Sequence, residues 1–241
     1  MQKVTHSEYI AQKKPLAKQL LAKLNEKYQY ASVLITDNYE KGYRASRSGV
    51  AISATNAFGG KGMIVKVYDG KGYAEYSTNE ITAENLPEIE REIEQQLMNP
   101  ANFIPEGTEE AEYKCISDEP CTLCEATDYE IHPREVGDEK LIETVTALRE
   151  KAVKADERIL DAITGFNYQE YHKLFLSANR ELEQSVLYST GIMALVAAKG
   201  EEIKQSFRGF SNLGGAELLD KMESAIPQLS LIHISEPTRR S

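Results

Sequence analysis

Three cysteines and a nearby histidine are the residues of this sequence best suited to chemistry. Cys115, Cys121 and Cys124 lie close together, and His132 follows them. Zinc favours thiolate and imidazole ligands, and a C-x-x-C pair can hold one ion from a tight turn. The third cysteine and the histidine could complete four ligands, although their spacing is irregular. The alternative is an incidental group of thiols in an exposed loop, and we expect these cysteines to be reduced and metal-free.

Other catalytic motifs do not match the sequence. The C-x-x-C in "EPCTLCEATD" does not open a helix after a strand, as a thioredoxin-like redox site requires. The segment "FGGKGMI" contains Gly59, Gly60 and Gly62. It has neither the glycine spacing of a dinucleotide site nor the Ser or Thr that follows the lysine of a phosphate loop. "RGFSNLGGAE" fails in the same way, and there is no G-x-S-x-G nucleophile elbow.

The histidines give no zinc motif on one helix. His6, His132, His172 and His233 are not spaced as in H-E-x-x-H or H-E-x-x-x-H. His172 lies in the strand-like segment "YHKLFLS", which favours a packed or surface histidine over a general base. The motifs alone therefore identify no catalytic, cofactor-binding or metal-binding residue.

Charge and hydropathy exclude two classes of partner. The formal net charge is −10, which argues against nucleic-acid binding because phosphate neutralisation needs a basic face. No segment approaches the roughly 18 apolar residues that a membrane span needs. The start, "MQKVTHSEYIAQKKPLAK", has no apolar region or small-residue cleavage site of a secretory signal. With an odd number of cysteines, this predicts a protein of the reducing cytoplasm.

The N-terminal part of the chain is predicted to form a helix, a sheet and a second helix. Pro15 stands where a helix could begin. Asp69-Gly70 supplies a two-residue hairpin turn within "GMIVKVYDGKGYAEYST". Thr82 is a suitable N-cap for a helix that stops before Pro100. The repeating apolar positions are Leu16, Leu20, Leu21 and Leu24 in the first helix, Met63, Val65 and Val67 in the hairpin, and Leu86, Ile89, Ile93 and Leu97 in the second helix.

The second part of the chain follows an acidic, proline-containing connection. A helix is predicted first, then several strands between about 156 and 210, then a helix near 215–225. One face of the first of these helices carries Leu141, Val145, Leu148 and Ala152. The whole pattern predicts an α+β fold of two lobes, with antiparallel sheets and packed helices.

These elements divide the chain into four predicted segments. They are a helix–sheet–helix lobe (1–100), the acidic Pro/Cys-containing connection (101–138), a helix with a second β-rich lobe (139–228), and a tail (229–241).

One long stretch reads "ASVLITDNYEKGYRASRSGVAISATNAFGGKGMIVKVYDGKGYAEYSTNEIT" and contains Lys66-Val67 in one strand and Gly72-Tyr73-Ala74 in the return. This stretch resembles the opening lobe of the TldD/PmbA family, the modulator-of-gyrase metallopeptidases. Lys66-Val67 stands in the family's R-V position and Gly72-Tyr73-Ala74 in its G-F-A position.

The second stretch is similar to the second lobe of that family. "ADERI" at 155–159 matches an A-D-x-R-V entry, and "VAAKGEEIK" at 196–204 matches a V-V-A-x-x-G-x-x strand. Gly214-Gly215 with Glu217 matches the glycine-rich run before the next helix. "ANRELE" replaces a frequent N-S-x-G, and the cysteine segment has no counterpart. Together the two stretches cover most of residues 30–228.

The resemblance implies a zinc-dependent peptidase for small or unfolded peptides, commonly assembled as a homo- or heterodimer of related subunits. In the catalytic branch, H-E-x-x-x-H and a later cysteine bind zinc, and the glutamate activates the metal-bound water. The sister branch lacks these ligands and serves as a non-catalytic partner subunit. In both branches, the segment that corresponds to H-E-x-x-x-H follows the glycine-rich run. No catalytic or metal residue therefore carries over to this chain, and no cofactor is expected in it. The alternatives, a partner subunit or a small structural-zinc loop protein, stay open.

The final residues, "LSLIHISEPTRRS" (229–241), differ from the rest of the chain. "LSLIHISEPTR" can be spelled by codons that look like a transposase adapter of sequencing libraries translated in frame. We therefore expect a non-native tail, a native frame interrupted near Gln228, and an N-terminal fragment that is inactive as a peptidase. Pro237 and the lack of apolar periodicity predict that this tail packs poorly.

Overall fold

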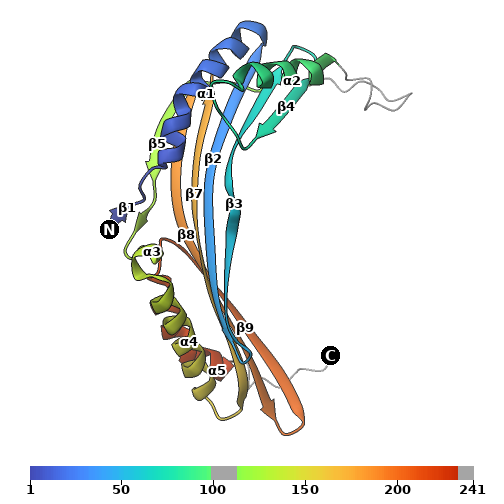
Figure 1. The fold of residues 1–241 in the computed structure, drawn as a ribbon. Coiled ribbons are helices and arrows are strands. Elements are labelled where there is room, and N and C mark those ends of the chain that lie inside the picture. Colours follow the sequence, from blue (N-terminus) through green and yellow to red (C-terminus); the bar gives the residue numbers. More distant parts are fainter. Residues whose placement is uncertain (99–112, 233–241) are drawn as a thin grey trace, which may run out of the picture.

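The computed structural model describes residues 1–98 and 113–232 (Figure 1). The strands are β1 (Gln2–Lys3), β2 (Tyr30–Ser46), β3 (Gly49–Tyr68), β4 (Tyr73–Thr78), β5 (Cys121–Ala126), β6 (Asp128–Tyr129), β7 (Ile159–Ser177), β8 (Arg180–Lys199) and β9 (Glu202–Leu213). The helices are α1 (Glu8–Lys27), α2 (Leu86–Met98), α3 (Pro133–Val136), α4 (Asp138–Lys154) and α5 (Leu218–Ile232).

One seven-stranded sheet dominates the structure. Its strand order is β4-β3-β2-β7-β8-β5, and β9 pairs with a further part of β8. All its neighbouring strands are antiparallel except β5, which runs parallel to β8. A small second sheet joins β1 to β6. The expected α+β class, with antiparallel strands and packed helices, is confirmed.

Two apolar cores lie at opposite ends of the long strands. Figure 1 shows the strands as a bow, with α1 and α2 at one end and α4 and α5 at the other. The α1–α2 core includes Leu20, Leu24, Val33, Val65 and Ile93. The α4–α5 core includes Tyr43, Leu141, Phe166, Leu187 and Met222. Each core forms because alternate residues of the long strands β2, β3, β7 and β8 are apolar and face the helices.

The sheet is continuous through both predicted lobes. Strand β2 pairs with β7 from Ser32↔Ser177 to Ala45↔Thr164. Strands from both predicted lobes contribute to each core. Leu174 of β7 lies in the α1–α2 core, and Tyr43 of β2 lies in the α4–α5 core. The two predicted lobes are therefore the two ends of one sheet. The division of the chain into segments by residue number stays a prediction.

Helix α1 begins one turn or more before the predicted start. The Ser7 side chain accepts a hydrogen bond from the Ile10 backbone N–H at 3.2 Å, which caps the helix. Pro15 lies inside the helix, where its ring nitrogen cannot bond to the carbonyl of Ala11. The starting position assigned to Pro15 was wrong, because a better cap lies upstream.

The predicted hairpin is confirmed between β3 and β4, but its loop is longer than the predicted two-residue turn at Asp69-Gly70. Tyr68 pairs with Tyr73, so the loop spans residues 69–72. The Asp69 carboxylate accepts the backbone N–H groups of Lys71 (2.8 Å) and Gly72 (2.9 Å). These bonds to the charged form hold the pKa of Asp69 below its usual value. Gly70 adopts φ +101°, a conformation that favours glycine.

The predicted helical stripes are buried as expected. In α2 these are Leu86, Ile89 and Ile93, and in α4 Leu141, Val145, Leu148 and Ala152. Thr82 and Asn85 bond reciprocally before α2, with Asn85 N–H donating to Thr82 Oγ1 at 3.3 Å and Thr82 N–H to Asn85 Oδ1 at 2.9 Å. The predicted stop of α2 before Pro100 lies outside the described residues.

Two segments contain more regular structure than predicted. Strand β5 lies within the predicted connection at 101–138. Helix α5 passes through Pro227 and ends at Ile232, so it includes the first residues of the predicted tail. The remainder of that tail lies outside the described residues. No helix in the described ranges is long and apolar enough to cross a membrane.

Candidate functional site: a polar strip between two cores

A strip of polar side chains separates the two cores on the helix-covered face of the sheet. Alternate residues of β7 share this face. Leu174 is in the α1–α2 core and Phe166 in the α4–α5 core, whereas His172 and Glu170 between them are polar and only 7% and 8% exposed. We define the polar strip as the connected set Cys124, His6, Ser185, His172, Glu170, His132 and Arg134.

Ser185 is the centre of the polar strip. Its hydroxyl lies 2.9 Å from Nδ1 of His6 and 2.9 Å from Nδ1 of His172. Ser185 is 1% exposed and pairs with His172 across β8 and β7. A hydroxyl donates one hydrogen bond and accepts others, so Ser185 can donate to one imidazole and accept from the other. It therefore links two histidines that are far apart in the sequence.

One end of the strip combines a thiol, an imidazole and a carboxylate. Cys124 Sγ lies 3.4 Å from Nε2 of His6. Glu183 Oε1 lies 3.7 Å from Nδ1 of the same ring. The Glu183 side chain is mostly buried and its other oxygen accepts a hydrogen bond from Lys14 Nζ at 2.9 Å. His6 thus has different partners on its two ring nitrogens.

The other end of the strip is a buried carboxylate among cations. Glu170 Oε1 lies 2.6 Å from Nε of Arg134 and 3.7 Å from Nε2 of His132. Its Oε2 lies 3.8 Å from Nε2 of His172. Burial raises the pKa of Glu170, but the His172 contact and the charge of Arg134 outweigh it, so the pKa falls below the usual value. Glu170 is therefore a charged group held by its neighbours.

Two of the strip's histidines enter it at helix starts. His6 precedes the α1 cap Ser7, whose hydroxyl also donates to Asp37 Oδ2 at 2.6 Å. His132 caps the short helix α3, with its Nδ1 accepting the Arg134 backbone N–H at 3.2 Å. The Arg134 guanidinium in turn lies 4.1 Å from the centre of the Tyr39 ring. Local capping therefore fixes both imidazoles relative to the sheet.

The structure separates the residues considered for a zinc cluster. Strand β5 is extended, so Cys121 and Cys124 point to opposite faces of it. Both are exposed, as is Cys115, and Cys124 contacts His6 rather than His132. Nowhere in the described ranges do three His, Cys, Asp or Glu side chains gather as a metal site would require. A strand, unlike the expected tight turn, cannot direct a C-x-x-C pair at one ion.

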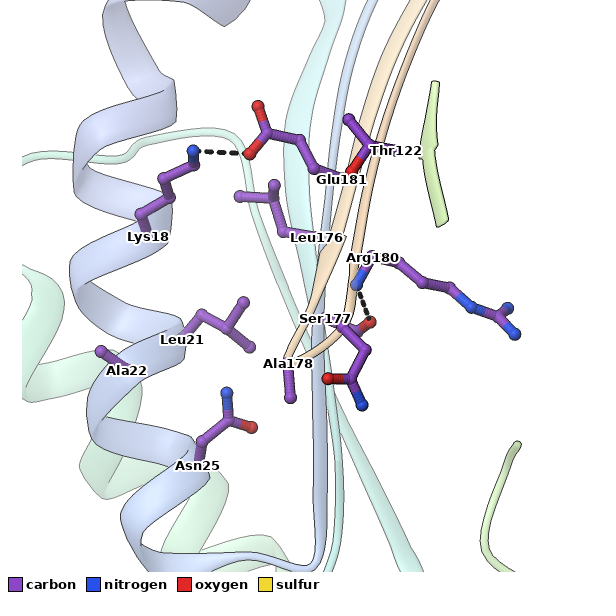
Figure 2. Close-up of a pocket in the computed structure, with 11 residues that line it drawn as sticks. Lys18, Leu21, Ala22, Asn25, Thr122, Leu176, Ser177, Ala178, Arg180 and Glu181 are labelled. Atoms are coloured by element: carbon purple, nitrogen blue, oxygen red, sulfur yellow. Dashed lines mark hydrogen bonds and ion pairs between the residues drawn. The ribbon is translucent and has the colours of Figure 1, made fainter. Parts of the chain in front are cut away.

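A hollow of about 390 Å³ lies between α1, strand β5 and the turn between β7 and β8, and its lining contains no residue of the strip. Figure 2 shows Lys18, Leu21 and Asn25 of α1 facing the turn between β7 and β8. Lys18 Nζ forms an ion pair with Glu181 at 2.6 Å. Thr122 of β5 completes this side of the hollow, two residues before Cys124.

The sequence motifs pointed only to part of the strip. Cys124 and His132 were candidates, and His172 was expected to be packed or on the surface, whereas Glu170 and Ser185 carried no motif. One signal was available: the inward positions of β7 change from Leu174 to His172 and Glu170 without losing the two-residue period. His233 lies outside the described residues.

Solved structures share this fold. A protein described as a modulator of DNA gyrase from Bacteroides thetaiotaomicron VPI-5482 matches 89% of this chain with a TM-score of 0.60 and 16% identity, over 49% of its own length. A protein of the same description from Thermotoga maritima MSB8 matches 90% of the chain with a TM-score of 0.66 and 14% identity, over 47% of its length. TldE from Thermococcus kodakarensis matches 89% with a TM-score of 0.62 and 14% identity, over 47% of its length.

The fold is therefore that of about half of a TldE or modulator-of-gyrase protein. The resemblance to the TldD/PmbA family is confirmed at the level of fold, and the chain spans about half the length of the structures that it matches. No protein-family model matches the chain. No curated protein matches it either.

Proposed function

We propose that this chain is the N-terminal half of a TldD/PmbA-type zinc-dependent peptidase that hydrolyses small or unfolded peptides. The observation that carries the proposal is the match of about nine-tenths of the chain to about half of three solved structures, two described as modulators of DNA gyrase and one as TldE. The order of elements and the quoted sequence stretches agree with this placement. The protein would work in the cytoplasm, consistent with its three free thiols.

The described half supplies a framework to the peptidase. Its continuous sheet is anchored by helices at both ends, which gives a long, stiff surface on which a second half can be built. The residues present do not fit a zinc site, since no ligand set gathers among those described. We therefore assign no hydrolytic step to the polar strip, and the zinc ligands would belong to the native sequence beyond Gln228.

A related subunit is the proposed partner. The same framework would serve a catalytic subunit or a non-catalytic sister subunit. The non-catalytic sister subunit is the alternative function. A small structural-zinc loop protein has less support, because Cys121 and Cys124 point to opposite faces of β5.

The test is the native coding sequence beyond the codon for Gln228, followed by an assay of the full-length protein. We expect an H-E-x-x-x-H motif and hydrolysis of a peptide pool that stops with chelator and returns with zinc. Exchange of the motif's glutamate for glutamine is the matched control. A native sequence without the motif would replace the catalytic assignment by the partner subunit, which should then co-purify with a zinc-bearing relative. A full-length protein with the motif but without zinc-dependent hydrolysis would refute the proposal.

A further inference from the structure

We propose that Cys124 is a reactive thiol, with His6 as its proton acceptor, that forms mixed disulfides with small peptide disulfides such as oxidised glutathione. The thiol is exposed, and its sulfur lies 3.4 Å from Nε2 of His6. At this distance the imidazole can take the thiol proton as the sulfur attacks, which is general-base activation of a nucleophile. The inference is independent of the peptidase assignment.

The second nitrogen of His6 fixes the ring for this role. Nδ1 lies 2.9 Å from the Ser185 hydroxyl and 3.7 Å from a Glu183 oxygen. With its proton on Nδ1, His6 donates to the Ser185 hydroxyl and leaves Nε2 free to accept the proton of Cys124. Ser185 and Glu183 are therefore positioning residues.

The hydrogen-bond directions agree along the whole strip. The Arg134 backbone N–H donates to Nδ1 of His132, which places that ring's proton on Nε2, toward Glu170. If Ser185 accepts from His6, its own proton is available to Nδ1 of His172. Nε2 of His172 then carries a proton toward Glu170. The negative charge of Glu170 near Nε2 of His172 favours this orientation, in which His6 Nε2 is an acceptor.

The pairing of β5 with β8 places the Cys124 thiol beside His6 and Glu183. Cys124 is the register partner of Glu183 in the parallel pair of strands. Cys121 belongs to the same strand but points to its other face, and Cys115 lies before the strand. Within the described parts of the chain, no imidazole contacts either of these two exposed thiols. Cys115 and Cys121 can therefore serve as internal controls when the reactivity of Cys124 is measured.

The exchange step balances without a further oxidant. His6 Nε2 takes the proton of Cys124, and the thiolate attacks one sulfur of the disulfide. A new bond forms between Cys124 Sγ and that sulfur while the bond between the two glutathione sulfurs breaks. The departing glutathione thiolate takes the proton from the His6 imidazolium, so one free thiol is released for each thiol consumed.

The neighbouring hollow suits a peptide-like adduct. Thr122 lines it and lies on the same face of β5 as Cys124, roughly 7 Å away along the strand. Lys18 and Asn25 add an ammonium group and a side-chain amide to its lining, and the ammonium is paired there with the carboxylate of Glu181 (Figure 2). Asn179 adds a second side-chain amide. These groups can bind the carboxylates and amides of a tripeptide, which an apolar electrophile does not carry.

The test compares the three cysteines within one chain by peptide mapping after timed reaction at pH 7. With iodoacetamide, we expect Cys124 to react about tenfold faster than Cys121 or Cys115, because it alone of the three contacts an imidazole among the described residues. His6→Gln should remove this advantage, whereas Lys140→Gln, a control at an exposed residue outside the polar strip, should keep it. Thermal unfolding of each variant verifies that the chain is folded. Equal rates at the three thiols, or an unchanged Cys124 rate in folded His6→Gln, would overturn the proposal.

Oxidised glutathione tests the identity of the adduct. We expect the preference for Cys124 to exceed that seen with iodoacetamide, and Lys18→Ala to reduce only the reaction with glutathione disulfide. A preference with iodoacetamide but none with glutathione disulfide would overturn the assignment of a peptide disulfide.

Discussion

The two apolar cores and the polar strip between them are built in different ways. Each core is formed by strands and helices whose apolar residues repeat with the period of the element. Each side chain there packs against several other apolar side chains, and no single contact defines the core. The polar strip depends on individual contacts: Ser185 between His6 and His172, and Glu170 between His172 and Arg134. The two cores stabilise the two ends of the sheet. The strip places polar and titratable side chains between them.

The largest expected effects come from the cores. Leu20→Ala in α1 and Leu141→Ala in α4 remove fully buried side chains from the two ends of the sheet. Each should lower the free energy of unfolding by about 2–5 kcal/mol. Since β2 and β7 run through both cores, both variants should shift one common denaturation transition. Two separate transitions, each sensitive to only one variant, would show that the cores unfold independently.

A smaller effect is expected from the strip. Glu170→Gln leaves Arg134 and two histidines without their carboxylate and should cost roughly 1–3 kcal/mol near neutral pH. The pKa of Glu170 is lowered on folding from 4.5, so its contribution is present above that value and lost as the pH falls through the lower, folded value. Denaturation at several pH values should show a shallower acid decline in the variant. Parallel declines would contradict this account of the carboxylate.

The cores could be predicted from the sequence far better than the strip. The stripe Leu141, Val145 and Leu148 and the alternation of Met63 and Val65 each lie within one element, so periodicity reveals them. The strip joins a residue before α1, a residue of β5, paired residues of β7 and β8, and the cap of α3. Such distant neighbours follow from strand register, which local patterns do not specify. The zinc alternative for the C-x-x-C pair could not be weighed from local patterns for a related reason, because a turn and a strand direct the two thiols differently.

The smallest effect is expected from the tail. Removal of residues 229–241 should change the free energy of unfolding by no more than about 0.5 kcal/mol, as for a segment outside the cores. The end of α5 at Ile232 sharpens this test. A second truncation after Ile232 keeps the whole helix. A midpoint lowered by several degrees in the shorter chain alone would mean that residues 229–232 belong to the fold.

Zinc content and peptide cleavage by the 241-residue chain test the central claim most directly. If this chain is the framework half of a peptidase, the protein purified free of host proteases should hold less than one zinc per chain and should not cleave a casein or peptide pool. The double variant Cys121→Ser/Cys124→Ser should give the same zinc content. One tightly held zinc per chain, together with chelator-sensitive cleavage, would contradict the account and place the catalytic site within this half.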